Sequence, residues 1–453
     1  MAHRLFGTDG VRGRAGAYPL DSETIRRLGA ALVRALPADD GRHRLLVGRD
    51  TRESGSWIVR EFAHGVRSAG GSIVSAGVIS TPAVAYLARE QAFDAGVVIS
   101  ASHNPFEDNG IKVFSGAGEK FTEQLERAVE AVVADRSWQV PAGEPAPLED
   151  LDLTAPYLEH ARIALPSAGR LAGLRLAVDC ANGATSAIAP RLFRELGFDL
   201  VVLGCEPDGR NINLECGSTK PAALARTVVA QGCRMGVAFD GDGDRAIFAD
   251  ASGRIVDGDG VLLLAARHLQ SAGRLRGNAI VATIMSNIGL EIALRESGIA
   301  LVRCPVGDKH VMEELIARNL SLGGEQSGHV IFSDFLFTGD GLVTALNVLQ
   351  VMAETGRELG DLAGELVTYP QVLVNVRVKE KRELQGIPEI AAVMDDVERR
   401  LGASGRLVVR YSGTEPLLRV MIEGQDQHQI TAWATEIADA ARRHLGEPAE
   451  GAA

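Results

Sequence analysis

One local pattern recurs three times in this chain and limits the folds available to it. An apolar segment is followed by a loop that contains glycine and then by an amphipathic segment with helical periodicity. The apolar segments lie at 45–47, 174–178 and 279–284. Short runs rich in Val, Ile and Leu that alternate with helices are typical of α/β units with parallel or mixed sheets. The sequence therefore predicts three similar α/β domains with mixed sheets, although no strict repeat relates them.

The order of elements changes after Pro370. The pattern there predicts a strand at 372–378, a helix near 388–401, a pair of strands around 406–423 and a helix near 427–445. These elements describe a smaller α+β domain, and 453 residues are too many for one ordinary core. The segment 138–152, with its three prolines, is expected to be a linker. We therefore expect domains at 1–150, 151–255, 256–367 and 368–446, with a disordered tail at 447–453.

The composition excludes several classes of protein. The chain is 46% hydrophobic and 23% charged, as expected of a soluble globular protein. A net charge of −12 argues against nucleic acid and anionic membranes as main partners. No apolar run approaches the roughly 18 residues of a membrane span, and the N-terminus does not read as a signal peptide. The five cysteines form no Cys-x-x-Cys pair, which is typical of reduced thiols. We expect a cytoplasmic protein.

A predicted buried strand at 235–239 runs directly into Asp240, Asp242 and Asp244, which alternate with glycines. The glycines allow the loop to fold so that the three carboxylates converge on one point. Like charges this close are unfavourable without a cation. Oxygen ligands suit Mg²⁺, which completes its coordination with water and phosphate oxygens. A solvated acidic turn explains one such aspartate better than it explains three.

Two other motifs that overlap this loop are rejected. A calcium-binding EF-hand would need Gly at Arg245 and Glu at Ala251. Residues 241–246 formally match the dinucleotide-binding fingerprint, but the residues after them read as a short strand and turn rather than a helix. A nucleotide-dependent dehydrogenase is therefore disfavoured.

A candidate nucleophile, Ser102, follows the apolar segment 95–99. A lone serine at such a position is most often a cap or a turn residue. The functional interpretation is favoured because His103, Asn104 and Lys112 provide basic and polar groups nearby. The chain contains neither a Gly-x-Ser-x-Gly elbow nor a Gly-Lys-Ser/Thr loop, which weakens the serine hydrolase and NTP-dependent kinase hypotheses. Together with the aspartates, Ser102 indicates phosphoryl transfer.

Two further loops have the composition of binding sites. The segment 323–329 places carboxylate, hydroxyl and imidazole groups between glycines, a mixture suited to sugar hydroxyls. The segment 410–416, followed by Arg419, offers two guanidinium groups, two hydroxyls and backbone N–H groups, which suit a phosphate. Each loop alone could be an ordinary turn.

Taken in order, these motifs resemble those of the α-D-phosphohexomutase superfamily over nearly the whole chain. The segments that carry the resemblance are 6–13, 100–105, 211–213, 240–245, 285–287, 324–329 and 410–416. The resemblance implies three similar α/β domains with mixed sheets and a smaller α+β C-terminal domain around a central cleft. One departure lies at 306–311, where Lys309 and His310 replace the Arg-Tyr pair that is more usual after the aspartate.

The resemblance also implies an activity. The chain would be an isomerase that interconverts glucosamine 6-phosphate and glucosamine 1-phosphate, for the synthesis of UDP-N-acetylglucosamine and peptidoglycan precursors. Ser102 would be a phosphoserine that passes its phosphoryl group to the sugar and recovers one from a sugar bisphosphate, which serves as intermediate and activator. Gln326 favours the amino sugar, because relatives that act on mannose or glucose phosphates usually carry Glu or Met there.

The same resemblance assigns the site residues. One Mg²⁺ per chain would be held by Asp240, Asp242, Asp244 and a phosphate oxygen on Ser102. Lys112 would be the general acid or base, with its pKa lowered by the arginine and the metal ion beside it, and Arg12 would stabilise charge nearby. His103 and Arg245 would orient the transferring phosphate. Sugar hydroxyls would be bound by Glu325 and Ser327, with help from His329. The other phosphate would be held by Arg410, Ser412, Gly413, Thr414 and Arg419.

Two alternatives stay open from the sequence. A phosphomannomutase or phosphoglucomutase would use the same chemistry on a different sugar. A non-enzymatic sugar-phosphate-binding regulator would bind without turnover, but the presence of Ser102, Lys112 and the aspartates together disfavours it. The expected partner is the phosphorylated hexosamine, with no nucleic acid or membrane, and a homodimer is left open.

Overall fold

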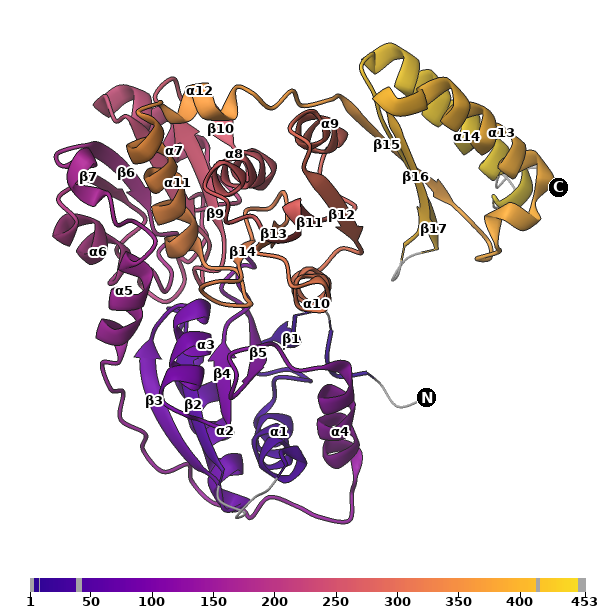
Figure 1. Ribbon diagram of the computed structural model, residues 1–453. Helices are drawn as coiled ribbons and strands as arrows, with labels where there is room; N and C mark the ends of the chain where they lie inside the picture. The colour runs from indigo at the N-terminus through magenta and orange to yellow at the C-terminus, as the bar shows by residue number, and fades with distance from the viewer. Residues whose placement is uncertain (1–3, 8, 38–42, 413–415, 447–453) are drawn as a thin grey trace. The chain divides into compact units, whose positions relative to one another are not determined.

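The computed structural model describes residues 4–7, 9–37, 43–412 and 416–446. The predicted phosphate ligands Gly413 and Thr414 and the predicted tail at 447–453 therefore lie outside the described residues. The chain forms two compact units (Figure 1). One unit contains Met1–Met285 and Ile299–Glu365, and the other contains Ser286–Gly298 and Leu366–Ala453.

The first sheet of the larger unit has the order β1-β5-β4-β2-β3. Its strands are β1 (Val11–Arg14), β2 (Arg44–Arg49), β3 (Ser72–Val78), β4 (Ala95–Ile99) and β5 (Asp108–Ser115). Its helices are α1 (Ser22–Ala35), α2 (Gly55–Ser68), α3 (Thr81–Glu90) and α4 (Glu123–Ala134). Val47 belongs to the hydrophobic core that also contains residues of α1 and α2. Its neighbour Leu46 is equally buried but does not belong to that core. Burial of alternate residues on both faces explains why these strands read as continuous apolar runs.

Two more sheets follow in the same unit. The second has the order β10-β9-β8-β6-β7, and the third has the order β12-β11-β13-β14. The strands of the second are β6 (Arg175–Asp179), β7 (Asp199–Leu203), β8 (Met235–Phe239), β9 (Ala246–Asp250) and β10 (Ile255–Val256). Those of the third are β11 (Ala279–Thr283), β12 (Ala300–Cys304), β13 (Leu322–Gly324) and β14 (Val330–Phe332). The helices of this part are α5 (Thr154–Arg162), α6 (Ala189–Glu195), α7 (Ala222–Gln231), α8 (Gly258–Ser271), α10 (Asp308–Arg318), α11 (Gly341–Thr355) and α12 (Leu359–Ala363). In the described part of the chain, no helix is long and apolar enough to cross a membrane.

The three sheets share one topology, which confirms the prediction of three similar mixed α/β domains. In each, a first strand pairs in parallel with two neighbours, and one of these neighbours then pairs antiparallel with the next strand along the chain. The strands before that antiparallel turn are β4, β8 and β13. The loops that follow them carry Ser102, the three aspartates and Glu325. Equivalent positions in three domains therefore supply the three candidate site loops.

The C-terminal sheet is antiparallel, with the order β15-β17-β16. Its strands are β15 (Gln371–Arg377), β16 (Arg406–Tyr411) and β17 (Leu417–Glu423), and its helices are α13 (Pro388–Leu401) and α14 (Gln427–Leu445). This arrangement confirms the predicted α+β pattern. Helix α9 (Ile288–Glu296) belongs to the same unit: the Asn287 side chain donates to the Tyr369 carbonyl (3.0 Å) and the Ile288 N–H donates to Glu423 (3.2 Å).

A buried carboxyl group joins α5 to the start of α11. Asp340 caps α11 through the Val343 N–H (3.0 Å) and accepts the Tyr157 hydroxyl (2.9 Å). Burial raises the pKa of Asp340 to about 6. The folded protein therefore keeps a proton there between pH 4 and 6 that the unfolded chain releases.

Replacing Asp340 with Asn should therefore stabilise the protein above pH 6. An amide keeps the acceptor for the cap and for Tyr157 and removes the buried charge. The gain over wild type should be absent near pH 4, grow as the pH rises from 4 to 6, and level off above pH 6 at about 1–3 kcal/mol. Urea unfolding at pH 4 and pH 7.5 measures it, and a variant less stable than wild type at pH 7.5 would contradict this account.

Candidate active site

Ser102 lies in the turn after β4 in a left-handed conformation, with φ of 51°. Its side chain is fully buried, and its Oγ donates a hydrogen bond to Asp240 Oδ2 (2.5 Å). The Nδ1 atom of His103 lies 3.3 Å from the same Oγ. A non-glycine residue in this region costs of order 1 kcal/mol and persists only where the surroundings enforce it. The turn therefore directs the serine hydroxyl at the aspartate loop.

The three predicted metal ligands converge. Each of Asp240, Asp242 and Asp244 offers a carboxylate oxygen, and these oxygens all lie within 4.8 Å of one another. Two glycines permit the fold of this loop: Gly243 has φ of 74°, and a Cβ on Gly241 would lie 2.5 Å from the Ser102 carbonyl oxygen. These glycines therefore allow the loop to fold so that the carboxylates converge, as the sequence predicted.

The donor set suits a hard divalent cation. Among the side chains of the described residues, the Oδ1 atoms of Asp242 and Asp244 are buried without a hydrogen-bond partner. Burial, with Asp244 and Asp242 close by, raises the pKa of Asp240 well above its ordinary value. Mg²⁺ bound here would give the two unpartnered carboxylate oxygens a ligand contact. It would also offset the repulsion that keeps Asp240 from ionising.

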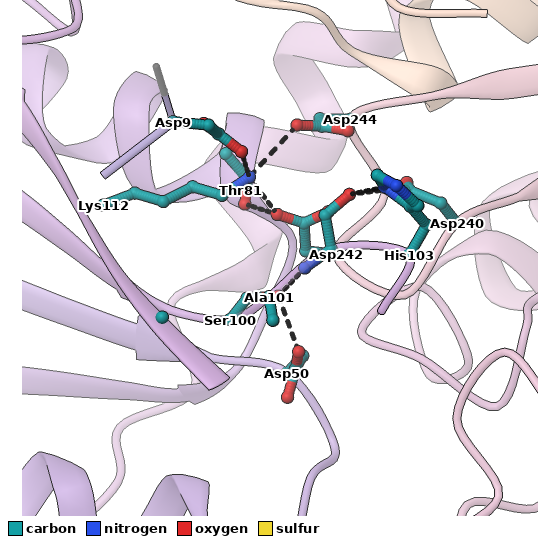
Figure 2. A network of polar contacts seen from close by, with 12 residues as sticks. Asp9, Asp50, Thr81, Ser100, Ala101, His103, Lys112, Asp240, Asp242 and Asp244 are labelled. Carbon is teal, nitrogen blue, oxygen red and sulfur yellow. Dashed lines mark hydrogen bonds and ion pairs between the residues drawn. The ribbon is translucent and has the colours of Figure 1, made fainter. Parts of the chain in front are cut away.

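Lys112 lies in direct contact with the aspartates, as Figure 2 shows. Its Nζ is 2.8 Å from Asp242, 3.0 Å from Asp9 and 3.4 Å from Asp244. Burial would lower the pKa of Lys112, but the three carboxylates outweigh burial and raise it well above its ordinary value. Lys112 is therefore the counter-ion of the cluster.

Arg12 joins the same network through Asp9. Its guanidinium pairs with the Asp9 carboxylate and approaches the Ala101 carbonyl (3.4 Å). Lys120 also pairs with Asp9 (2.5 Å) and with Asp308 at the start of α10. Neither Asp9 nor Lys120 was predicted as a site residue, because an Asp and a Lys 111 positions apart form no local motif.

His103 and Arg245 line a pocket of about 570 Å³ together with Arg12 and Glu325. Burial, with Arg245 and Arg12 nearby, lowers the pKa of His103 to about 4. His103, which the sequence places among the basic groups near Ser102, is therefore neutral at pH 7 in this environment. Asp244 and Asp240 keep Arg245 charged against the effect of burial, because they raise its pKa. Of His103 and Arg245, Arg245 is therefore the residue that carries a positive charge.

The predicted sugar loop divides into exposed and buried parts. Glu325 lines the pocket and accepts the Gly307 N–H (3.2 Å), and Ser327 is exposed. The Gln326 amide donates to Asp257 Oδ2 (3.1 Å), so this residue also braces the start of α8. His329 is only 1% exposed, and its Nε2 accepts the Gly339 N–H (3.0 Å).

His329 also lies beside two carboxylates of the site. Its Nδ1 lies 3.7 Å from Asp244, and its Nε2 lies 3.7 Å from Asp308. Both of these carboxylates line the pocket. Lys309, part of the departure noted in the sequence, pairs with Glu126 of α4 (2.9 Å).

In the C-terminal unit, Arg410 and Arg419 are register partners on β16 and β17. Two guanidinium groups at facing positions on neighbouring strands can bind one anion together. Ser412 follows β16 and is buried, and its carbonyl accepts a hydrogen bond from Lys381 Nζ (2.6 Å). The predicted phosphate loop thus starts beside two cations on neighbouring strands, and Lys381 is a third that the sequence analysis did not identify.

Models of a single protein family match nearly the whole chain. They describe the phosphoglucomutase/phosphomannomutase alpha/beta/alpha domains I, II and III and the C-terminal domain. They match residues 3–139, 155–253, 257–369 and 373–440 respectively.

Similar proteins span the full length. The phosphoglucosamine mutase of Solibacter usitatus is 49% identical over 450 residues, which cover 99% of this chain and 100% of that protein. The phosphoglucosamine mutase of Syntrophotalea carbinolica is 44% identical and covers 98% of this chain and 99% of its own. Among solved structures, a phosphoglucomutase/phosphomannomutase family protein of Burkholderia thailandensis has a TM-score of 0.79 at 24% identity and covers 98% of both chains. The N-acetylphosphoglucosamine mutase of Aspergillus fumigatus, in complex with GlcNAc-6P and magnesium, has a TM-score of 0.66 at 19% identity, with 97% of this chain and 95% of that chain covered.

Proposed function

The chain belongs to the phosphoglucomutase/phosphomannomutase family, and from this premise we propose that it interconverts glucosamine 6-phosphate and glucosamine 1-phosphate through a phosphoserine at position 102. It is an isomerase, and relatives 42–49% identical over the full chain are named for this reaction. The observation that carries the phosphoserine mechanism is the 2.5 Å hydrogen bond from Ser102 Oγ to Asp240 inside a cluster of three carboxylates. The product would enter the synthesis of UDP-N-acetylglucosamine.

In the proposed reaction, a sugar hydroxyl oxygen attacks the phosphorus on Ser102. The bond from phosphorus to Ser102 Oγ breaks, and the sugar becomes a bisphosphate. After the bisphosphate reverses its orientation, Ser102 Oγ attacks the other phosphate and releases the monophosphate product. Mg²⁺ held by Asp240, Asp242 and Asp244 would neutralise charge on the transferring group. Arg245 and Arg12 both line the pocket. Arg245 would orient the transferring phosphoryl group, and Arg12 would stabilise its charge.

Lys112 is the proposed proton carrier. Its pKa is raised because the charges of Asp242, Asp9 and Asp244 reach it across 2.8–3.4 Å. Lys112 can accept the hydroxyl proton only where these carboxylates are engaged by another cation, since its pKa then falls towards the range of a general base. His103, which is neutral and 3.3 Å from Ser102 Oγ, would position the hydroxyl and then the phosphate. Glu325 and Ser327, with His329 behind them, remain the proposed sugar-binding residues.

The second phosphate of the substrate would be held by the C-terminal unit. Arg410, Ser412, Gly413, Thr414 and Arg419 are the proposed ligands. Replacing Arg410 with Met should raise KM for the sugar phosphate roughly 10- to 100-fold, as expected when a charge-assisted contact is lost, and should leave the fold intact because it removes one of two opposed charges. Steady-state kinetics measures this. Arg377→Met, an exposed arginine on the same sheet, is the control, and equal KM values for the two variants would refute the assignment.

The proposed substrate is tested by kcat/KM of the purified protein with Mg²⁺ and a trace of hexose bisphosphate as primer. The substrates are glucosamine 6-phosphate, glucose 1-phosphate and mannose 1-phosphate. A clear preference for the amino sugar is the expected result. Preference for a neutral hexose phosphate would keep the mechanism and overturn the substrate, and no turnover on any of the three would overturn both.

A further inference from the structure

Arg52, which follows β2, lies directly beneath the turn that carries Ser102. Its side chain is completely buried and forms an ion pair with Asp50 through Nε (2.9 Å). The guanidinium also donates to three backbone carbonyls of this turn: those of Ser102 (2.9 Å), Asn104 (2.9 Å) and Pro105. One rigid, planar group thus holds most of the turn.

A second connection runs from the same ion pair to the Ser102 backbone N–H. Asp50 Oδ2 accepts the Ser100 hydroxyl (2.6 Å), and Ser100 Oγ accepts the Ser102 N–H (2.9 Å). Figure 2 shows Asp50 on one side of Ser100 and Ala101 and the three aspartates on the other. Both the N–H and the carbonyl of Ser102 are therefore fixed through the Asp50–Arg52 pair.

The second domain contributes a third contact to the turn. The Asn213 side chain donates to the same two carbonyls as Arg52, those of Ser102 (2.9 Å) and Asn104 (3.2 Å). Gly241 packs against the Ser102 carbonyl at a distance that excludes a larger residue. The Ser102 carbonyl is therefore enclosed by the donors of Arg52 and Asn213 and by the loop that carries the three aspartates.

The equivalent loop of the second domain is built in the same way. Asp179, at the end of β6, accepts the N–H groups of Ala181 (2.9 Å) and Gly217 (2.8 Å). The loop it holds then donates from the Ala184 N–H to the Gly241 carbonyl (2.8 Å). The loops after β2 and β6, which are equivalent strands, therefore support the serine loop and the aspartate loop respectively.

We propose that Arg52, paired with Asp50, is a positioning residue for phosphoryl transfer: it holds Ser102 in its left-handed conformation so that Oγ keeps one place relative to Asp240 whether or not it carries phosphate. The inference rests on the proposed phosphoserine mechanism. Ser102 alternates between a neutral hydroxyl and a dianionic ester, and the turn is strained in both states. The side-chain donors of Arg52 and Asn213 restrain the turn. The charge of Arg52 is already balanced by Asp50.

Arg52→Met tests the proposal, with Arg27→Met as a matched control. Arg27 is also buried and donates to three backbone carbonyls, those of Val133, Asp135 and Trp138, but it lies away from the pocket. The measurements are the thermal midpoint, the rate at which a hexose 1,6-bisphosphate phosphorylates Ser102, followed by intact-protein mass spectrometry, and kcat and KM. Both variants should lose stability, but only Arg52→Met should lose phosphorylation rate and kcat, by roughly 100-fold, as expected for a reacting atom displaced by about 1 Å. KM should change less than roughly threefold, since no sugar contact is removed.

Ser100→Ala keeps the test decisive if Arg52→Met does not fold, because it removes only the hydroxyl between Asp50 and the Ser102 N–H. It should lower kcat roughly tenfold, as expected for one lost hydrogen bond that orients a reacting group, with KM unchanged. Arg52→Lys, which keeps the charge but cannot reach three carbonyls, should fall between Arg52→Met and wild type. The proposal is overturned if Arg52→Met or Ser100→Ala retains the wild-type phosphorylation rate. A wild-type protein that is neither phosphorylated on Ser102 nor active would instead overturn the proposed function, and the positioning role with it.

Discussion

Replacing Ser102 with Ala should abolish turnover while the protein remains folded. The substitution removes the only atom proposed to carry the phosphoryl group, so the loss in kcat should be roughly 10⁴-fold or more, as for other covalent nucleophiles. Ala tolerates the left-handed turn about as well as Ser does, and Arg52 and Asn213 hold the Ser102 backbone rather than its side chain. The lost bond to Asp240 should cost about 1–3 kcal/mol of stability, because it leaves a buried carboxyl group without its hydrogen-bond partner.

The measurement is kcat with glucosamine 6-phosphate, Mg²⁺ and a bisphosphate primer, together with the mass of the protein before and after incubation with the primer. Ser68→Ala is the control, because the Ser68 hydroxyl makes one backbone contact in α2 (2.7 Å). Wild type and the control should become phosphorylated, and the Ser102 variant should not. Wild-type rates in Ser102→Ala would refute the phosphoserine mechanism outright.

Replacing Asp240 with Asn should stabilise the metal-free protein and abolish its response to Mg²⁺. Asp244 and Asp242 both pair with Lys112, whereas no lysine contact is recorded for Asp240 among the described residues, and burial with the two neighbouring carboxylates raises its pKa. An amide at this position removes a charge that the metal-free fold accommodates badly. It also removes a ligand on which the proposed magnesium site depends, so kcat should fall roughly 10³-fold or more, as expected when charge stabilisation in the transition state is lost.

Thermal midpoints in EDTA and in millimolar MgCl₂ separate these effects. Wild type should be stabilised by Mg²⁺, since a ligand that binds only the folded state raises its stability. The Asn variant should have the higher midpoint in EDTA and no shift with Mg²⁺. The control is Asp250→Asn: Asp250 is a buried acid whose pKa is lowered by its partners Ser252 and Arg254, despite burial. That control should lose stability and keep its Mg²⁺ response, and a Mg²⁺ shift in Asp240→Asn equal to that of wild type would contradict the metal assignment.

The motifs with short spacing were identified from the sequence. Ser102 and the three aspartates each follow an apolar strand, and the structure brings them together as expected, with 2.5 Å between Ser102 Oγ and Asp240. The pairs that connect distant segments were not identified. Asp9 and Lys120 meet across 111 positions, and Asn213 reaches Ser102 from another domain, so no local spacing could indicate them. Asp50 and Arg52 were visible as part of a glycine-bearing loop, but nothing in that loop indicates which carbonyls the guanidinium binds.

The charge states of the site depend on the tertiary structure. From the sequence, the pKa of Lys112 was expected to be lowered by Arg12 and a metal ion beside it, and His103 was counted among the basic and polar groups near Ser102. In the structure, the carboxylates of Asp242, Asp9 and Asp244 raise the pKa of Lys112, and burial with Arg245 and Arg12 nearby lowers that of His103 to about 4. A pKa depends on every charge within several ångströms and on the solvent lost, and neither quantity is local in the chain.

The sequence by itself determined the class of fold, the four-part organisation and the chemistry of the candidate loops, because strand and helix periodicity and glycine placement are properties of short segments. Only the tertiary structure decided that β4, β8 and β13 occupy equivalent positions, and hence that a serine, three aspartates and a glutamate meet near one pocket. It also decided that Arg52 lies beneath the nucleophile and that Lys112 neutralises the aspartates. Contacts of this kind follow from how strands order within a sheet and how domains pack, and burial then sets the energy of each charge.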